Sequence, residues 1–256
     1  MADSKKVLVT GMSGLIGGIV GRHLASLGHE IRALNRQTVE GFDTVQADIT
    51  DFKAIRPAFD GIDTVIHLAA YLGNDDKSQI DVNITGTYNL FEAAGDAGVK
   101  RFVFGSSGAV QRAAEQYEPI KSMVEARVDD IPDPRPVVTH LDPPWPDNMY
   151  GVVKTAGEAM ARLFSETYGS AIVVRIGRVR AEDRPANARE ASVYFSHRDV
   201  EQMFEKCVAA PEDLKWDVFY GVSDNFTRFR DISHAKEVIG YVPQDGIRSW
   251  PHGNQD

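Results

Sequence analysis

The stretch Gly11-Met12-Ser13-Gly14-Leu15-Ile16-Gly17 decides the fold of this 256-residue chain. The apolar run 7–9 before it predicts a buried strand, and the apolar-periodic segment 15–27 after it predicts a helix that stops at Gly28. Glycine permits positive φ and a close backbone approach, and a helix N-terminus offers free N–H groups to an anion. The stretch is therefore predicted to bind a dinucleotide pyrophosphate, with a plain structural turn as the alternative. The predicted binding residues are Gly11, Ser13, Gly14, Leu15, Ile16 and Gly17.

Strands and helices continue to alternate beyond this turn. Most apolar runs are followed by a segment with helical spacing, and such crossovers build a parallel sheet with helices on both faces. The expected fold is α/β, a Rossmann-type doubly wound parallel sheet that occupies residues 1–176. The expected strands are 31–34, 44–47, 64–68, 101–104 and 171–176, and the expected helices are 55–59, 81–97 and 150–168.

Two segments depart from this alternation. Residues 111–148 hold seven prolines and little periodicity, which predicts an ordered loop excursion, and long loops inside domains are usually functional or mobile. After residue 176 the pattern weakens to a helix near 200–209, a strand near 217–220 and a short helix at 233–239. Residues 177–256 are therefore expected to form a small lobe that covers a substrate.

Composition restricts the partners. The formal net charge of −9 argues against sequence-independent attraction to nucleic acid or to anionic membranes. The single cysteine, Cys207, excludes an internal disulfide and fits a reducing compartment. The first six residues lack the apolar core of a secretory leader, and no run approaches the roughly 18 apolar residues of a membrane span. We expect a soluble, cytoplasmic protein with a small-molecule partner. No metal is predicted, because the histidines lack ligand spacing; they include His67, His140, His197 and His234.

The end of the second expected strand bears on the choice between NAD and NADP. An acidic residue there would bind the ribose 2′-hydroxyl of NAD, whereas an arginine would accept the 2′-phosphate of NADP. Residues 34–37 contain no carboxylate, and Asn35 is followed by Arg36. A guanidinium binds phosphate through charge-assisted hydrogen bonds, so NADP is favoured over NAD, with a solvated surface arginine as the alternative. Asp48 and Ile49 are expected near the adenine ring.

Tyr150 and Lys154 lie four residues apart and so share one face of the long expected helix. A free tyrosine has a pKa of about 10, too high for an efficient base at neutral pH. A neighbouring ammonium and an oxidised nicotinamide both favour the phenolate, so we predict that Tyr150 acts as an acid/base on a hydroxyl group. Lys154 would also position the nicotinamide ribose. Ser106 and Ser107, which end a strand, would supply the hydroxyl that orients the substrate oxygen.

Together these motifs resemble the extended short-chain dehydrogenase/reductase family. The resemblance covers residues 7 to about 176 in the family's order and rests on the glycine turn, 48–51, 67–70, Asn83, Ser106-Ser107 and Tyr150-x-x-x-Lys154. It implies an NAD(P)-dependent oxidoreductase with Tyr150 as acid/base, Lys154 as its electrostatic partner and Ser107 as the third catalytic member. It also implies that Asn83 supports the site. The expected cofactor lining further includes Leu68, Ala69, Ala70, Asn83, Ser106 and Ile176.

A narrower likeness concerns the substrate. Residues 174–177, 194–199 and 219–223 resemble the uronate dehydrogenase branch, whose members oxidise the anomeric carbon of a sugar acid to a lactone. That branch has a serine where Arg178 stands and an asparagine where Gly108 stands, and Arg189 corresponds to its carboxylate-gripping arginine. Guanidinium groups bind carboxylate or phosphate bidentately, so these arginines predict a uronate or a sugar phosphate as substrate, with a solvated loop held by local ion pairs as the alternative. The expected substrate-binding residues are Ser107, Gly108, Arg178 and Arg189.

Other function classes stay open. One is a sugar epimerase or dehydratase that keeps its cofactor, although such enzymes usually have a longer C-terminal part than the segment after Ile176. Another is an NADP-binding regulator without catalysis, which would have no need of the serine, tyrosine and lysine. The broad apolar faces at 84–94 and 156–163 predict a homo-oligomer, a dimer or higher, with core packing in a monomer as the alternative.

Overall fold

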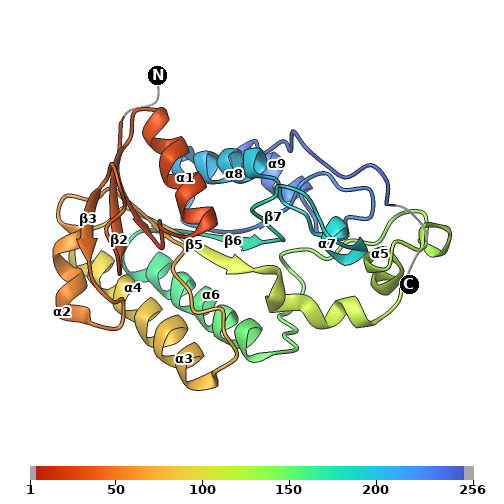
Figure 1. The fold of residues 1–256 in the computed structure, drawn as a ribbon, viewed down its shortest axis with the longest axis horizontal. Coiled ribbons are helices and arrows are strands. Elements are labelled where there is room, and N and C mark those ends of the chain that lie inside the picture. The colour runs from red at the N-terminus through yellow and green to blue at the C-terminus, as the bar shows by residue number, and fades with distance from the viewer. Residues whose placement is uncertain (1–3, 251–256) are drawn as a thin grey trace.

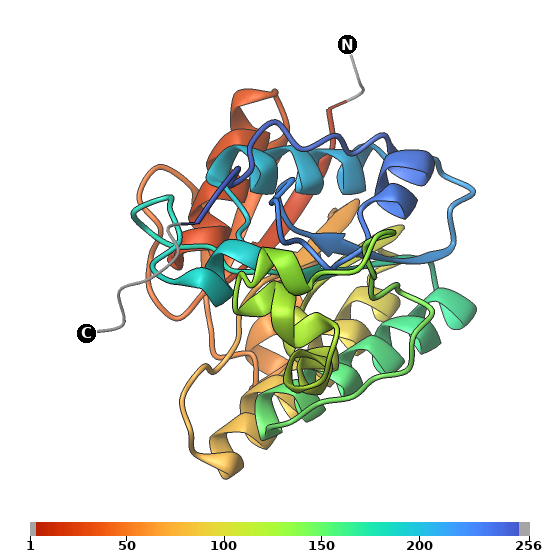
Figure 2. The same ribbon diagram turned by 90° about the vertical axis from the view of Figure 1, so that its right-hand side faces the viewer.

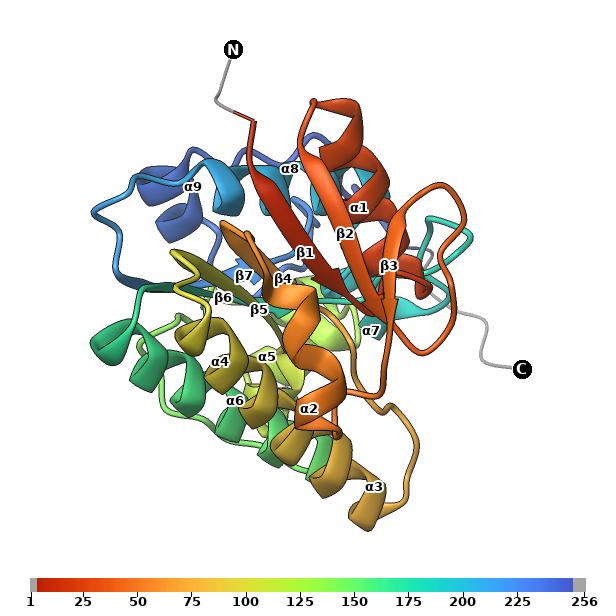
Figure 3. The same ribbon diagram turned by 90° about the vertical axis from the view of Figure 1, so that its left-hand side faces the viewer.

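The structure, a computed structural model, describes residues 4–250. At its centre lies a seven-stranded parallel sheet with the order β3-β2-β1-β4-β5-β6-β7 (Figures 1 and 3). The chain runs outward from β1 to β3, crosses back to β4 and continues to the opposite edge, which confirms the Rossmann-type sheet. The strands are β1 (Lys6–Thr10), β2 (Glu30–Asn35), β3 (Asp43–Gln46), β4 (Thr64–His67), β5 (Arg101–Ser107), β6 (Ser170–Ile176) and β7 (Trp216–Gly221).

Helices cover both faces of the sheet, with α1, α8 and α9 on one side and α2, α4 and α6 on the other (Figure 3). Neighbouring residues of a strand point to opposite faces, so each strand serves both cores. Val7 and Val9 pack in the cluster that includes α1 and α8, whereas Leu8 packs in the cluster that includes α4 and α6. The α-helices are α1 (Leu15–Ser26), α2 (Phe52–Ile55), α3 (Asp76–Ile80), α4 (Thr87–Asp96), α5 (Ile120–Val124), α6 (Met149–Thr167), α7 (Ala188–Ser192), α8 (His197–Ala209) and α9 (Ser233–Ile239).

The proline-rich excursion is more structured than the loop that the sequence predicts. It contains a 3₁₀ segment η3 (Gly108–Gln116), the helix α5 and a second 3₁₀ segment η4 (Val128–Asp130). Ile120 and Met123 pack against Val193 and Phe229, and Figure 2 shows the yellow-green excursion beside the turquoise α7. A kink at Gln111 interrupts η3, and α5 and η4 have only five and three residues, so none of them gives a long periodic apolar pattern in the sequence.

The expected helix 81–97 is also interrupted. A π-helical segment η2 (Asp81–Gly86) precedes α4, and the short α3 comes before it. Single π-helical turns inside helices are rare and frequently lie at functional sites. The expected helix 55–59 is divided between α2 and a 3₁₀ turn η1 (Arg56–Phe59), because Pro57 lacks the N–H that would continue the α-helical ladder.

Residues after 176 do not all lie outside the sheet. β7 pairs in parallel with β6 as the seventh strand, and Phe204 and Cys207 of α8 share a core with Val7 of β1. The boundary expected at residue 176 is therefore not a boundary of the sheet. The first three residues, part of the start considered above for a leader, and the last six residues of the expected lobe lie outside the described range.

The parallel strands all end at one edge of the sheet, which brings the predicted motifs together. The glycine turn follows β1, Asn35 ends β2, His67 ends β4 and Ser107 ends β5. In open α/β sheets the ligand crevice lies at these carboxyl ends, where the strand order reverses. Among residues 4–250, no helix combines the length and apolar character that a membrane crossing demands.

Candidate functional site

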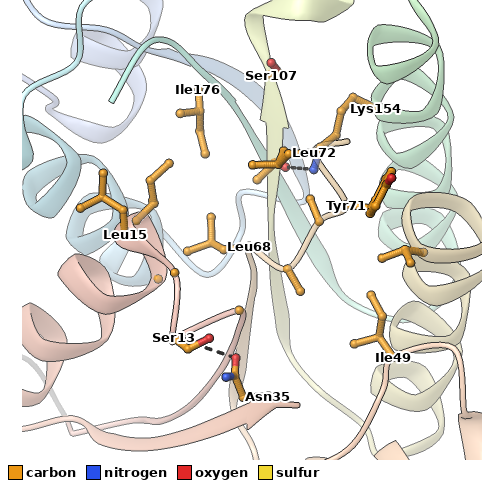
Figure 4. Close-up of a pocket in the computed structure, with 18 of the residues that line it drawn as sticks. Ser13, Leu15, Asn35, Ile49, Leu68, Tyr71, Leu72, Ser107, Lys154 and Ile176 are labelled. Atoms are coloured by element: carbon orange, nitrogen blue, oxygen red, sulfur yellow. Dashed lines mark hydrogen bonds between the residues drawn. The ribbon is translucent and has the colours of Figure 1, made fainter. Parts of the chain in front are cut away.

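A cleft of about 1180 Å³ opens at the carboxyl ends of the strands. Ser13 and Asn35 lie at one end and Ser107 and Lys154 at the other, as Figure 4 shows. The volume exceeds that of most pockets for drug-sized ligands, which span roughly 300–1,000 Å³, so the cleft has room for a dinucleotide and a small second molecule.

The glycine turn forms one end of this cleft. Gly11 has φ of +72°, and a Cβ there would lie 2.7 Å from the Ala69 backbone nitrogen, so only glycine lets the turn pack against the segment after β4. Gly14 is the N-cap residue of α1, and no side chain caps the helix. The first N–H groups of α1 are therefore left for a ligand, which is the arrangement that suits a pyrophosphate.

Next to the glycine turn, the cleft is lined by the end of β2 and by the loop after β3, where the adenosine was predicted. The Asn35 Oδ1 atom accepts a 3.5 Å hydrogen bond from the Ser13 backbone N–H, which ties the end of β2 to the glycine turn (Figure 4). Arg36 lines the cleft and is exposed. Hydrogen bonds from Thr50 and the charge of Arg36 lower the pKa of Asp48, so its carboxylate is ionised at neutral pH.

Tyr150, Lys154 and Ser107 lie together at the far end. Asn148 caps α6 by accepting a 2.8 Å hydrogen bond from the Gly151 N–H, and this cap starts the helix one residue before Tyr150. The Lys154 ammonium donates a 2.7 Å hydrogen bond to the Gly105 carbonyl and lies 5.8 Å from the centroid of the Tyr150 ring. The Ser107 hydroxyl oxygen accepts the Ala109 N–H at 3.1 Å, which leaves its hydrogen free to donate.

Burial dominates the titration of these groups. It raises the pKa of Tyr150 to about 12, and the hydrogen bond with Ser107 acts in the opposite direction. Burial likewise lowers the pKa of Lys154 to about 8, although the Glu158 carboxylate raises it. The sequence analysis expected the ammonium and an oxidised nicotinamide to lower the pKa of the phenol together. In the protein without a cofactor, the ammonium does not bring this pKa to neutral pH.

Most of the predicted residues line the cleft. These are Gly11, Ser13, Gly14, Leu15, Ile16, Gly17, Asn35, Arg36, Asp48, Ile49, Leu68, Ala69, Ala70, Ser106, Ser107, Tyr150, Lys154, Ile176 and Arg178. Sequence reasoning missed the segment 71–73, which follows the 67–70 motif directly and lines the cleft with Tyr71 and Leu72 (Figure 4).

Three predicted residues have other positions. The Asn83 amide makes hydrogen bonds of 2.8 and 2.9 Å with the backbone of Tyr71, so it supports the cleft wall from behind. The Gly108 carbonyl accepts a hydrogen bond from buried Arg230. Arg189 is not among the cleft-lining residues, because Glu115 of the excursion binds its Nε at 2.6 Å and its Nη2 at 3.2 Å.

Arg178 has the more open position of the two predicted substrate arginines. Its backbone forms an isolated β-bridge with Tyr194, two residues after β6 ends. The Nε atom of its half-exposed side chain lies 3.1 Å from Glu190 Oε1. Its terminal nitrogens form no hydrogen bond with the described residues. Arg178 can therefore offer a guanidinium edge to an anionic ligand.

The histidines have structural neighbours. His67 is buried, and its two ring nitrogens lie 2.7 Å from Thr10 Oγ1 and 3.0 Å from Thr87 Oγ1. The fold brings ligand atoms of His140, Asp217 and His234 within 4.8 Å of one another, a cluster that spacing in the sequence could not reveal. However, the two imidazoles stack at 3.9 Å with planes 15° apart, and a shared ion would have to lie in both planes. The absence of a metal stays a prediction.

Known proteins resemble this chain throughout its length. The sequence model of the NAD dependent epimerase/dehydratase family matches residues 7–239. An NAD-dependent glucose-6-phosphate dehydrogenase from Haloferax volcanii is 34% identical over 93% of each chain. An L-arabinose 1-dehydrogenase (NAD(P)(+)) from that organism is 31% identical over 94% of this chain and 96% of the relative. A crystal structure of a uronate dehydrogenase from Agrobacterium tumefaciens, a tyrosine-to-alanine mutant complexed with NAD, has a TM-score of 0.81 and 28% identity, covering 99% of this chain and 93% of that chain.

Proposed function

Because the chain belongs to the NAD dependent epimerase/dehydratase family, we propose that it is a dehydrogenase that oxidises the anomeric carbon of an aldose or sugar acid to a lactone. The observation that carries this proposal is the placement of Tyr150, Lys154 and Ser107 at one end of a cleft whose other end is the glycine turn. The names of the relatives, which act on glucose-6-phosphate, arabinose and uronate, support the same reaction class.

The residues of the cleft have separate roles in this reaction. The Ser107 hydroxyl donates to the substrate oxygen and holds it beside the phenol. The Tyr150 phenolate removes the hydroxyl proton as the carbonyl forms, and the Lys154 ammonium stabilises the phenolate. The turn 11–17 and the ends of β2 and β3 hold the dinucleotide. When bound, the oxidised nicotinamide supplies the hydride acceptor and a positive charge.

The two pKa values show why a further positive charge is needed. The active form needs Tyr150 ionised and Lys154 protonated, yet the pKa of the phenol, about 12, exceeds that of the ammonium, about 8. A bound cofactor whose oxidised nicotinamide carries a positive charge would lower the pKa of the phenol, because a nearby cation favours the phenolate.

A substrate panel tests the proposal. Aldoses, uronates and sugar phosphates are each incubated with NAD and with NADP, and the formation of the reduced cofactor is followed by absorbance. We expect net reduction with at least one sugar of the panel. Turnover of the sugar without any net change in the cofactor would indicate an epimerase, and cofactor binding without turnover would indicate a regulator.

Arg36 is expected to set the cofactor preference. We propose that the protein accepts NAD and that Arg36 additionally favours NADP, since no carboxylate at 34–37 opposes a 2′-phosphate. Arg36→Ala should raise the KM for NADP about 10- to 100-fold, the loss of a charge-assisted hydrogen bond, and leave the KM for NAD within about 3-fold. Gln37→Ala, an uncharged change in the same part of the cleft, is the control. Equal effects on both cofactors would contradict the assignment.

Arg178 is expected to select anionic sugars. Arg178→Ala should raise the KM for glucuronate or glucose-6-phosphate about 10- to 100-fold more than the KM for arabinose, because the neutral sugar has no group for the guanidinium. Initial rates with the three sugars measure this ratio. Arg189→Ala is the control: it removes one of the two arginine partners of buried Glu115, the other being Arg230, and should lower stability without changing the ratio. A larger change of the ratio in the Arg189 variant would transfer the role to Arg189.

Two further properties belong to the same proposal. We expect a homo-oligomer, supported by large apolar side chains of α4 and α6 that are about half exposed or more, namely Tyr88, Val152 and Leu163. We also expect a cytoplasmic location, supported by the single, fully buried cysteine, which has no partner for a disulfide.

A further inference from the structure

Three polar residues of α6 face three consecutive residues at the end of β5. Tyr150, Lys154 and Glu158 are spaced by four and so lie on one face of the helix. Ser107 lowers the pKa of Tyr150, the Lys154 ammonium donates to the Gly105 carbonyl at 2.7 Å, and the Ser106 hydroxyl donates to Glu158 Oε1 at 2.6 Å. Glu158 and Ser106 therefore form a further contact between α6 and the end of β5, and the reaction described above does not use this contact.

Glu158 also connects these residues of α6 and β5 to the neighbouring strand β6. Its carboxylate is buried and binds Arg175 of β6 in a bidentate pair, with distances of 2.9 and 2.8 Å. Arg175 in turn donates to Gln111 of the excursion and to Tyr220 of β7. The pair satisfies hydrogen-bonding groups on both sides, as a buried ion pair must if its desolvation is to be offset.

The charged and titratable groups around Lys154 are few. The helix itself contributes Tyr150 and Glu158, β4 contributes His67, β5 contributes only a carbonyl and the Phe104 ring, and β6 contributes Arg175 behind Glu158. His67 is neutral, because burial and Lys154 hold its pKa well below the usual range. Among these groups, Glu158 is thus the carboxylate that raises the pKa of Lys154.

We propose that Glu158 is a positioning residue of the reaction: it fixes the end of β5 against the catalytic helix and supplies the negative charge that retains the Lys154 ammonium. This inference rests on the proposed function. The field of Glu158 opposes the burial that brings the pKa of Lys154 down to about 8. Without that field the ammonium loses its proton at lower pH, and the phenolate loses its partner there.

The sign of the pH effect follows from this charge. Activity falls as pH rises through the pKa of Lys154, because the neutral amine no longer stabilises the phenolate. Removal of the Glu158 charge lowers that pKa, so the falling limb of the profile moves to lower pH. We expect Glu158→Gln to shift this limb by about one pH unit and to lower kcat about 10- to 100-fold. The KM for the sugar and the affinity for NADH should stay within about 3-fold.

The variants separate charge, geometry and stability. Glu158→Gln leaves the charge of buried Arg175 without its carboxylate and can unfold the protein. If it does, the double variant Glu158→Gln/Arg175→Gln, which removes both charges, is used for the same measurements. Glu158→Asp keeps the charge and should lower kcat while the alkaline limb stays in place. Glu166→Gln is the matched control, since Glu166 is an exposed carboxylate of the same helix paired only with Arg162 among the described residues.

Hydrogen exchange supplies a measurement independent of activity. Peptides that cover residues 105–109 should exchange faster in the glutamine variants than in the wild type or in Glu166→Gln. Folded glutamine variants with wild-type exchange and a wild-type alkaline limb would overturn the proposal, as would equal effects of Glu166→Gln. A wild type that reduces neither cofactor with any sugar refutes the proposed function instead, and the exchange data still decide the positioning of β5.

Discussion

Replacing Tyr150 by phenylalanine should lower kcat for sugar oxidation about 10²- to 10⁴-fold, the contribution of a positioned acid/base group. The change removes one oxygen atom and keeps the ring that packs beside Lys154, 5.8 Å from its ammonium. Cofactor binding should persist, because the turn 11–17 and the ends of β2 and β3 are untouched. Steady-state rates and quenching of protein fluorescence by NADH measure the two effects separately.

Ser107→Ala provides a graded comparison for this variant. It removes the hydroxyl that orients the substrate oxygen and leaves the phenol in place, so kcat should fall less than in Tyr150→Phe. A Tyr150→Phe enzyme that keeps wild-type kcat would refute the assigned base. Circular dichroism checks that the variant is folded, so that a loss of NADH binding through unfolding is distinguished from the loss of the phenol.

Gly17→Ala should abolish useful cofactor binding, with an affinity for NADH reduced at least about 100-fold. A Cβ at Gly17 would lie 2.3 Å from the Gly11 carbonyl oxygen and 2.8 Å from Met12 Cα, both backbone atoms of the phosphate turn. The turn must move, and each charge-assisted hydrogen bond lost to the pyrophosphate costs about 1.5–3 kcal/mol. Overpacking of this kind also lowers the free energy of unfolding by about 1–3 kcal/mol, which thermal denaturation measures.

Gly18→Ala is the matched control on the same helix turn. The atoms nearest to a Cβ there belong to the end of the Arg22 side chain, at 2.9 Å, and that side chain can turn away. Alanine has the higher helix propensity, so the variant should be as stable as the wild type or up to about 1 kcal/mol more stable. Equal loss of NADH affinity in both variants would contradict a specific role for the turn, and unchanged affinity in Gly17→Ala would refute it.

The sequence identified the parts of the site that depend on local geometry. The glycine turn, the end of β2 at Asn35, the strand-end serines and the Tyr150–Lys154 pair are all encoded within a few residues, and the structure places them around one cleft. The doubly wound parallel sheet followed from the alternation of elements, because right-handed crossovers leave few other arrangements. The glycine turn could be predicted from its glycine spacing together with its place between a strand and a helix.

Pairings between distant segments needed the tertiary structure. The resemblance favoured Arg189 as the carboxylate-binding arginine, yet Glu115, 74 positions away, binds that guanidinium, whereas Arg178 lines the cleft. The last strand, β7, joins the sheet rather than a separate lobe, since its apolar residues complete the core that β6 leaves open.

The sequence by itself determined the fold class, the glycine turn and the placement of Tyr150 and Lys154 on one helix face, because these depend on backbone conformations and helix spacing that short segments dictate. Only the tertiary structure decided which charges pair, which arginine lines the cleft and that Glu158 of α6 links Ser106 to Arg175. The physical reason is burial: an ionisable group removed from water must find a partner, and packing of remote segments selects which partner it finds.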